Sequence, residues 1–468
     1  MNFQEQVPEE LWLEIIRHLP KEALPAVALT HRAFHRILRP MLFTNFTFRP
    51  YAVAYLPRDR RRVLWPEATE PIQFPQHTYD HELARLNFWS STEIAPLVRS
   101  CTLIPSYSPS TDRVTNTGTN VPTPLLTLFF ERLARFISIR YFHGFFVRIT
   151  QTGLANLCRL PVLTCSDIFV CSALEPLDFS ALQLQHVTNL YIAGAVKSNN
   201  SLDWMCILRP TQLIEVHLAF SPQLFTEIAH SMPTWPQVKK LTIGRILLGD
   251  TLRPPGIPTV LPVLAKFPGV EKFALEGRWN TWDWVPSTSH SLPCLQDYTG
   301  PAKVLGIFRA HTGLARASIH GVSSSWITET VQESKTRPLS ISSLRITSSP
   351  LDIPAFNALF DIFPLMVHLD INIFHSLDIL SECPRFLENL TVTPSLPITL
   401  ESLSFRWERN DANLATENDG LVADELSFRT GLRALVERYP ALKSFCIDCP
   451  VFSFRLRRLP NGTVDAYW

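Results

Sequence analysis

Apolar side chains in the first part of the chain recur with the spacing of an amphipathic helix. Residues three and four positions apart share one face of a helix, so this run predicts a helix that begins after Pro8 and ends at Pro20. A proline can start a helix because the backbone N–H that it lacks would have no partner in the first turn. A proline further along ends the helix. The apolar positions of this helix are Leu11, Trp12, Ile15, Ile16 and Leu19.

Two more short helices are predicted, one from near Leu24 through Leu29 and one that stops at Pro40. So small a unit cannot bury all of its apolar surface in itself, and the surplus is expected to dock on another polypeptide. The alternative is that the three helices only cap the domain behind them, as terminal units of repeat proteins do. The apolar positions of the two helices are Leu24, Val27, Ala28, Leu29, Phe34, Ile37 and Leu38.

Behind these helices a spacing of three apolar positions recurs: apolar, two residues, apolar, one residue, apolar. The last two positions alternate as in a strand with one buried face, so each unit predicts a short strand. The units are Val187-Leu190-Ile192, Leu213-Val216-Leu218, Val238-Leu241-Ile243, Val270-Phe273-Leu275, Leu314-Ala317-Ile319, Ile341-Leu344-Ile346, Met366-Leu369-Ile371, Leu387-Leu390-Val392, Leu400-Leu403-Phe405 and Leu442-Phe445-Ile447. Prolines that end a preceding helix recur at Pro161, Pro236, Pro268, Pro293, Pro364 and Pro440.

Helical patterns precede several units, at residues 222–232, 259–267, 353–363 and 432–439. Strands and helices that alternate at intervals of roughly 19 to 32 residues are typical of leucine-rich-repeat-like solenoids. We therefore expect an irregular α/β solenoid with a parallel sheet along its concave side. The segments FSFRLRR and TVDAYW flank Leu-Pro-Asn-Gly, which predicts that the chain closes with a β-hairpin.

Composition narrows the class of partner. The formal net charge of +1 over 468 residues implies no general attraction to nucleic acid or to a membrane surface. The N-terminus lacks the pattern of a signal peptide, and no apolar run approaches the roughly 20 residues of a membrane span. These features predict a protein of the cytoplasm or nucleus, in which the nine cysteines stay reduced. Cys446 and Cys449 form a CxxC without a second pair, so no zinc site is expected.

Residues 7–43 resemble an F-box, the motif with which members of that family bind the Skp1 adaptor of a cullin-based ubiquitin ligase. The resemblance rests on a proline, an acidic residue, a leucine, an isoleucine pair, a leucine-proline step and two further apolar helices, in that order. The sequence departs from the family pattern at Val7, Ala23 and Pro25. The resemblance implies that Skp1 contacts Pro8, Leu11, Trp12, Ile15, Ile16, Leu19, Pro20, Leu24, Val27 and Leu29.

The whole chain is similar to F-box proteins with leucine-rich-repeat-like tails, which are numerous in fungi and in which the tail is taken to hold the substrate. The resemblance implies a three-helix F-box at 1–48, a linker and helical connector at 49–92, and a substrate-binding α/β domain at 93–468. Within it, residues 105–124 contain almost no large apolar side chain and are predicted to form a disordered loop. The basic residues 57–62 are interpreted as a solvated linker, or as a contact for an acidic partner.

No motif of catalysis or cofactor binding appears, so we expect neither an enzyme nor a bound cofactor or metal. The chain lacks the glycine-rich phosphate loops, the nucleophile elbow and the paired-histidine zinc motif. His77 and His81 lie four residues apart but have no plausible third ligand. Trp279, Trp282 and Trp284 form a cluster that either anchors a target protein or holds a loop against the solenoid.

Two functions fit this sequence. The first is a substrate-recognition subunit of an SCF-type E3 ubiquitin ligase, which binds Skp1 through the F-box and a target protein through the solenoid. The second is a non-catalytic scaffold that binds Skp1 without acting in ubiquitination. An enzyme would need acid and base residues that converge in one cleft, and no local group of such residues stands out.

Overall fold

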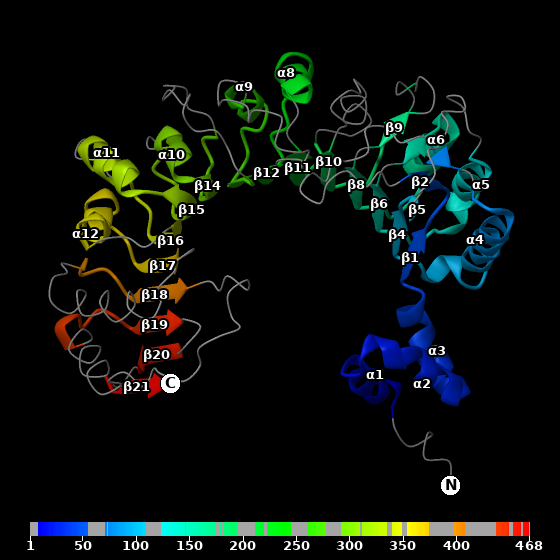
Figure 1. Cartoon of the computed structure of the whole chain (residues 1–468), viewed down its shortest axis with the longest axis horizontal. Coiled ribbons are helices and arrows are strands. Elements are labelled where there is room, and N and C mark those ends of the chain that lie inside the picture. Colours follow the sequence, from blue (N-terminus) through cyan, green and yellow to red (C-terminus); the bar gives the residue numbers. More distant parts are fainter. Residues whose placement is uncertain are drawn as a thin grey trace, which may run out of the picture. The chain divides into compact units, whose positions relative to one another are not determined.

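The computed structural model describes residues 8–54, 71–72, 74–108, 123–145, 147–169, 171–173, 178, 182–193, 211–219, 222–244, 260–277, 292–308, 311–334, 339–348, 353–373, 396–407, 437–448, 453–459 and 462–467 (Figure 1). The chain forms two compact units. Unit 1 contains residues 1–238 and 245–253, and unit 2 contains residues 239–244 and 254–468. The sequence pattern does not predict this division.

Unit 1 begins with three short α-helices, in the places where the apolar spacing predicts them. These are α1 (Glu9–Arg17), α2 (Leu24–Thr30) and α3 (Arg32–Leu42), with the 3-10 helix η2 (Lys21–Ala23) before α2. The prediction that Pro40 stops the third helix is wrong, because Pro40 lies inside α3. Helix α3 ends only two residues later, and the N–H of Phe43 still donates to the carbonyl of Arg39 at 3.1 Å. A proline in a last turn removes few backbone bonds, so the helix tolerates it.

The strands of unit 1 form a parallel sheet with helices on one side (Figure 1). In spatial order the strands are β1 (Asn45–Phe48), β4 (Ser100–Leu103), β6 (Tyr141–Phe145), β8 (Cys165–Phe169), β10 (Asn189–Ala193) and β11 (Glu215–Ala219). The helices of this unit behind α3 are α4 (Gln76–Trp89), α5 (Pro124–Arg132), α6 (Gln151–Cys158) and α8 (Pro222–Ser231). Phe48 of β1 contacts Phe129 of α5 with ring centroids 5.4 Å apart, which places the core between strands and helices.

Two small sheets accompany the strands of unit 1. One contains β2 (Ala52–Ala54), β3 (Pro71–Ile72) and β5 (Ser106–Ser108), and the other contains β7 (Arg148–Ile149) and β9 (Ser172–Ala173). Strand β5 therefore occupies the start of the predicted loop 105–124, of which residues 109–122 lie outside the described residues. The basic residues 57–62 also lie outside them.

Unit 2 continues the same architecture of parallel strands backed by short helices. Its strands are, in spatial order, β12 (Lys240–Gly244), β13 (Lys272–Leu275), β14 (Asp297–Pro301), β15 (Arg316–Val322), β16 (Ser343–Ser348), β17 (His368–Ile373), β18 (Ser402–Trp407), β19 (Ser444–Asp448), β20 (Ser453–Arg458) and β21 (Val464–Tyr467). Its helices are α9 (Leu261–Leu264), α10 (Ala302–Leu305), η6 (Gly306–Phe308), α11 (Ser324–Ser334) and α12 (Ile353–Ile362).

The predicted closing hairpin is confirmed: β20 and β21 pair antiparallel. Gly462 adopts a φ of +82°, which glycine reaches without strain, and its N–H donates to the carbonyl of Leu459 at 2.9 Å. Strand β20 also pairs antiparallel with β19. The hairpin therefore extends the sheet of unit 2 instead of standing apart from it.

Nine of the ten predicted units are strands whose three apolar side chains are at most 4% exposed, and the tenth, at 387–392, lies outside the described residues. Among the described strands outside the two small sheets, five were not predicted, namely β1, β4, β6, β8 and β14. Strand β1 lies within the segment 1–48 assigned to the F-box and pairs with β4. The predicted linker and connector 49–92 contains β2, β3 and α4. The fold is thus mixed α/β with a mostly parallel sheet, consistent with a leucine-rich-repeat-like solenoid.

A repeated backbone contact sets the register of these strands. The carbonyl of Thr44, just before β1, accepts hydrogen bonds from the N–H groups of Arg99 and Ser100, just before and at the start of β4. The same bifurcated contact recurs along both units, with acceptors Arg99, Arg140, Thr164 and Thr188 in unit 1 and Lys239, Glu271, Gln296, Ala315, Ser342, Val367 and Glu401 in unit 2. Each repeat is therefore fixed to the next at the start of its strand.

Helix packing in unit 1 depends on a close approach at Gly153. A Cβ at this position would lie 2.8 Å from Cδ2 of Phe130, a fully buried ring of α5. We expect Gly153→Ala to lower the free energy of unfolding by about 1–2 kcal/mol, because overpacking outweighs the higher helix propensity of alanine. Chemical denaturation monitored by circular dichroism measures this change.

Gly306→Ala is the matched control. No atom lies within 4 Å of the Cβ that this substitution would add, so the free energy of unfolding should stay within about 0.5 kcal/mol of the wild-type value. Equal effects of the two substitutions would contradict the packing argument.

Candidate functional site

The first candidate site is an apolar ridge on α1, formed by Leu11 and Ile15. These side chains lie one helical turn apart and remain 56% and 52% exposed. On α2, Leu29 is 85% exposed. When a partner covers large apolar side chains with this exposure, removing them from water stabilises the complex by about 1–2 kcal/mol each. The ridge and Leu29 therefore suit a protein contact.

Other residues of the predicted Skp1 contact belong to the interior of the helices themselves. Ile16 is 2% exposed and Leu24 is 7% exposed, and both pack in one cluster with Ala28, Ile37 and Leu38. Trp12, Leu19 and Val27 are partly buried against this cluster. The Trp12 ring meets Phe34 edge-on at 4.9 Å between centroids. Of the ten predicted contact residues, the exposed ones are Pro8, Leu11, Ile15, Pro20 and Leu29.

Helix α3 joins this helical cluster to the sheet of unit 1. Arg39 donates through Nη2 to both the carbonyl oxygen and the carboxylate of Glu93, at 3.0 and 2.9 Å. At the end of α3 the Phe43 ring packs against Phe88 and Trp89 of α4, with centroids 5.6 and 5.5 Å apart. Strand β1 starts two residues later. The ridge on α1 therefore sits on a cluster that is attached to the repeats at one end.

The second candidate site is the sheet face of unit 1 that points away from the helices, the outward face. A row of rings crosses it from strand to strand, with Phe145, Phe169 and Tyr191 at centroid distances of 5.7 and 6.1 Å. His217 continues the row at 4.2 Å from Tyr191. The sequence pattern did not predict this row, although Tyr191 and His217 hold the same place in their repeats and Phe145 pairs with Phe169.

A polar group on the same face contains a histidine, an aspartate and a cysteine. His143 Nδ1 lies 2.6 Å from Oδ2 of Asp167, and Sγ of Cys165 lies 3.7 Å from Oδ1 of the same carboxylate. A cysteine beside a histidine and a carboxylate is a combination found where a cysteine acts as a nucleophile. However, burial, followed by the nearby carboxylate, raises the pKa of Cys165 to about 12. The thiol stays protonated near neutral pH, so the group is not an activated nucleophile.

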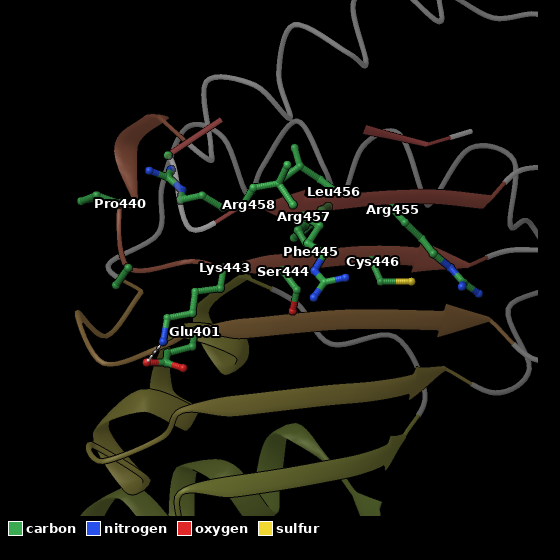
Figure 2. Close-up of a pocket in the computed structure, with 13 residues that line it drawn as sticks. Glu401, Pro440, Lys443, Ser444, Phe445, Cys446, Arg455, Leu456, Arg457 and Arg458 are labelled. Carbon is green, nitrogen blue, oxygen red and sulfur yellow. Dashed lines mark hydrogen bonds and ion pairs between the residues drawn. The ribbon is translucent and has the colours of Figure 1, made fainter. Parts of the chain in front are cut away.

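The third candidate site is the outward face of unit 2. Small serines line a hollow of about 340 Å³ together with Arg316, Arg345, Arg406 and Asp370. Further along the sheet, Arg455 and Arg457 line a hollow of about 1110 Å³ with Ser444 and Cys446 (Figure 2). Figure 2 shows both arginine side chains extending from β20 toward β19. A salt bridge of 2.6 Å between Lys443 and Glu401 borders the second hollow.

The remaining predicted residues contribute no chemical site within the described part of the chain. Trp279, Trp282 and Trp284 lie outside the described residues, as does Cys449. His77 and His81 are exposed on α4, and the described ranges contain no group of three or more side chains that could hold a metal ion. No helix of the described residues is long and apolar enough to cross a membrane.

Comparisons with known proteins leave the family open. No protein family matches the sequence. No curated protein matches it. Among solved structures, the chain is similar to one in a crystal structure of a TLR13–ssRNA13 complex, with 13% identity and a TM-score of 0.31. The match covers 67% of this chain and 36% of that chain, so this chain matches about a third of that protein's length.

The elevated pKa of Cys165 predicts slow alkylation. With a pKa of about 12, only about one thiol in ten thousand is ionised at pH 8, and the rate should rise about tenfold per pH unit. Exposed Cys294 is the internal reference. Mass spectrometry after a short iodoacetamide pulse should find Cys294 modified well before Cys165. Modification of Cys165 at the rate of Cys294 would contradict the elevated pKa of Cys165.

Proposed function

We propose that the chain is a substrate-recognition subunit of an SCF-type E3 ubiquitin ligase. In this proposal the helical cluster is an F-box that binds Skp1, and through it a cullin, while the repeats hold a target protein. The protein performs no bond chemistry of its own. It raises the concentration of a target near a catalyst, as tethering does.

The observation that carries the proposal is the exposure of Leu11 and Ile15 on a helix that already has a core of its own. A cap needs one apolar face, turned toward the repeats, but the core of α1–α3 is formed by the helices themselves. The ridge is thus apolar surface beyond what the cluster needs for folding. The resemblance of residues 7–43 to the F-box supplies the identity of the partner.

Side-chain exposure selects a smaller set of proposed Skp1-contact residues than the resemblance to the F-box implies. Leu11, Ile15 and Leu29 offer side chains to a partner, whereas Ile16 and Leu24 would stabilise the F-box from within. A surface of two or three apolar anchors surrounded by polar residues is typical of helix-mediated contacts.

The runner-up function is a scaffold that binds Skp1 without recruiting a cullin. Both functions use the same ridge, so the experiment that separates them is co-purification of a cullin with the Skp1 complex. An increase of a bound protein after proteasome inhibition would favour the ligase.

The ridge can be tested with Leu11→Asp combined with Ile15→Asp. Two carboxylates in place of apolar anchors should weaken Skp1 binding at least a hundredfold, because their burial loses apolar contact and leaves charges unpaired. Binding of purified full-length protein to Skp1, measured by calorimetry, checks this. Both positions are exposed, so the thermal unfolding temperature should change by no more than about 2 °C.

Thr30→Asp combined with His35→Asp adds the same number of carboxylates at exposed polar positions of α2 and α3, and should bind Skp1 as the wild type does. Ile16→Asp is not informative, since a charge in the cluster would unfold it. Undiminished binding by the Leu11/Ile15 variant would remove the F-box proposal.

A further inference from the structure

Basic side chains are concentrated on the outward face of unit 2. In the register of the strands, the cations at outward positions are Lys240, Lys272, Arg316, Arg345, Arg406, Arg455 and Arg457, and the carboxylates are Asp297, Asp370, Asp448 and Asp465. The outward positions of β1, β4, β6, β8, β10 and β11 in unit 1 contain Asp167 and Glu215 and no lysine or arginine. The net charge of the whole chain is only +1, so this face is a local excess.

Two of these arginines are held by carboxylates beneath them. Arg316 donates through Nε to Oδ2 of Asp297 at 3.1 Å, and Arg345 donates through Nε to Oδ2 of Asp370 at 3.0 Å. The arginine side chains are 54% and 57% exposed, whereas the two aspartates are 29% and 20% exposed. An Nε contact orients a guanidinium and leaves its four terminal N–H donors. Within the described residues, no other group bonds these terminal nitrogens.

The other arginines are held loosely or not at all. Nε of Arg406 lies 3.8 Å from Oδ1 of Asp370, beyond hydrogen-bond distance. Arg455 and Arg457 are exposed and make no ion pair with any described residue. Exposed guanidinium groups without a carboxylate are suited to an anionic ligand, with which they form two parallel hydrogen bonds.

Small side chains between the arginines leave room for a chain to lie on the sheet. Ser318, Ser343, Ser402 and Ser404 line the smaller hollow. The hydroxyl of Ser444 donates to that of Ser402 at 2.8 Å, and Ser444 lines the larger hollow of Figure 2. The two hollows therefore adjoin across β18 and β19.

The spacing of the arginines fits an extended peptide that crosses the strands. Arg345, Arg406 and Arg455 lie on β16, β18 and β20, each of which lies roughly 10 Å from the next along the sheet. Arg345 and Arg455 share one row across the sheet, and Arg406 lies two residues along its strand from that row. A peptide in the extended polyproline II conformation has three residues per turn and advances about 3.1 Å per residue, so every third side chain faces the sheet at steps of roughly 9 Å. At each of these positions the guanidinium of an arginine can form two parallel hydrogen bonds with one carboxylate of the peptide.

We propose that the outward face of β14–β20 binds an extended acidic peptide segment of a partner protein, with aspartate or glutamate at every third position. The proposal deepens the proposed function, since this partner would be the recruited target. A nucleic acid fits less well. The outward positions of β12–β20 contain no phenylalanine, tyrosine or tryptophan on which bases could stack.

The test uses the full-length chain and a fluorescent thirteen-residue peptide with glutamate at every third position between glycine and serine. The variant Arg406→Gln/Arg455→Gln/Arg457→Gln leaves the bonds of Arg316 and Arg345 in place, so it should fold. We expect fluorescence anisotropy to show at least tenfold weaker binding by this variant. Wild-type affinity should fall as salt concentration rises.

The matched control removes three exposed arginines of unit 1, with Arg99→Gln/Arg140→Gln/Arg159→Gln, and should retain wild-type affinity. No binding of the peptide by wild type, equal weakening by both triple variants, equal binding of a peptide with contiguous glutamates, or tighter binding of a single-stranded oligonucleotide would overturn the proposal. The Leu11→Asp/Ile15→Asp variant should bind the peptide normally. Failure of Skp1 binding and failure of peptide binding are thus separate results.

Discussion

The repeats depend on one backbone interaction, the carbonyl that accepts two successive N–H groups from the next repeat. In unit 2, for example, the carbonyl of Ser342 accepts from Val367 and His368 at 2.7 and 2.9 Å. Donors and acceptor are backbone groups, so any residue with an N–H can make the interaction. At some positions a hydroxyl adds to it, as Ser342 does by donating to the carbonyl of Ala315 at 3.2 Å. The backbone interaction starts the parallel strands that it joins at the same level, and the apolar side chains of each unit then reach the core in register with those of the neighbours. A single repeat cannot bury this face alone, so the stability of each repeat depends on the next one.

This dependence explains how much of the fold was predictable from the sequence. Nine described units with three apolar residues were found, because their spacing is local, although Phe43-Phe46-Phe48 at β1 and Val98-Cys101-Leu103 at β4 have the same spacing and were missed. Strands β6 and β14 were missed because Gly144 and Gly300 occupy the third position of the unit, where the volume is filled from elsewhere. Sγ of Cys171 lies 3.2 Å from where a Cβ of Gly144 would be, and the Tyr298 hydroxyl lies 2.5 Å from that of Gly300. A partner 27 residues away, such as Cys171, is not visible in a local pattern.

The N-terminal helices show a different limit. The spacing identified two neighbouring apolar ridges on α1, one with Leu11 and Ile15 and the other with Trp12 and Ile16. Which ridge turns inward depends on where α3 packs, and the edge-on contact between Trp12 and Phe34 decides it. The sequence therefore predicted the residues of the helical cluster but not their division between core and surface. That division matters for function, because only the outward ridge is available to a partner without opening the cluster.

The outward face of the sheet follows from the same register. In unit 2 the residue between the last two apolar positions of a unit points away from the core, so the row across β15–β19 is Ser318, Arg345, Asp370, Ser404 and Cys446. Packing imposes nothing on these positions, and their chemistry can change without cost to the core. The composition of the outward face as a whole differs between the units, with aromatic rings on unit 1 and arginine with serine on unit 2. Since folding does not require this difference, it is best explained by what each face contacts.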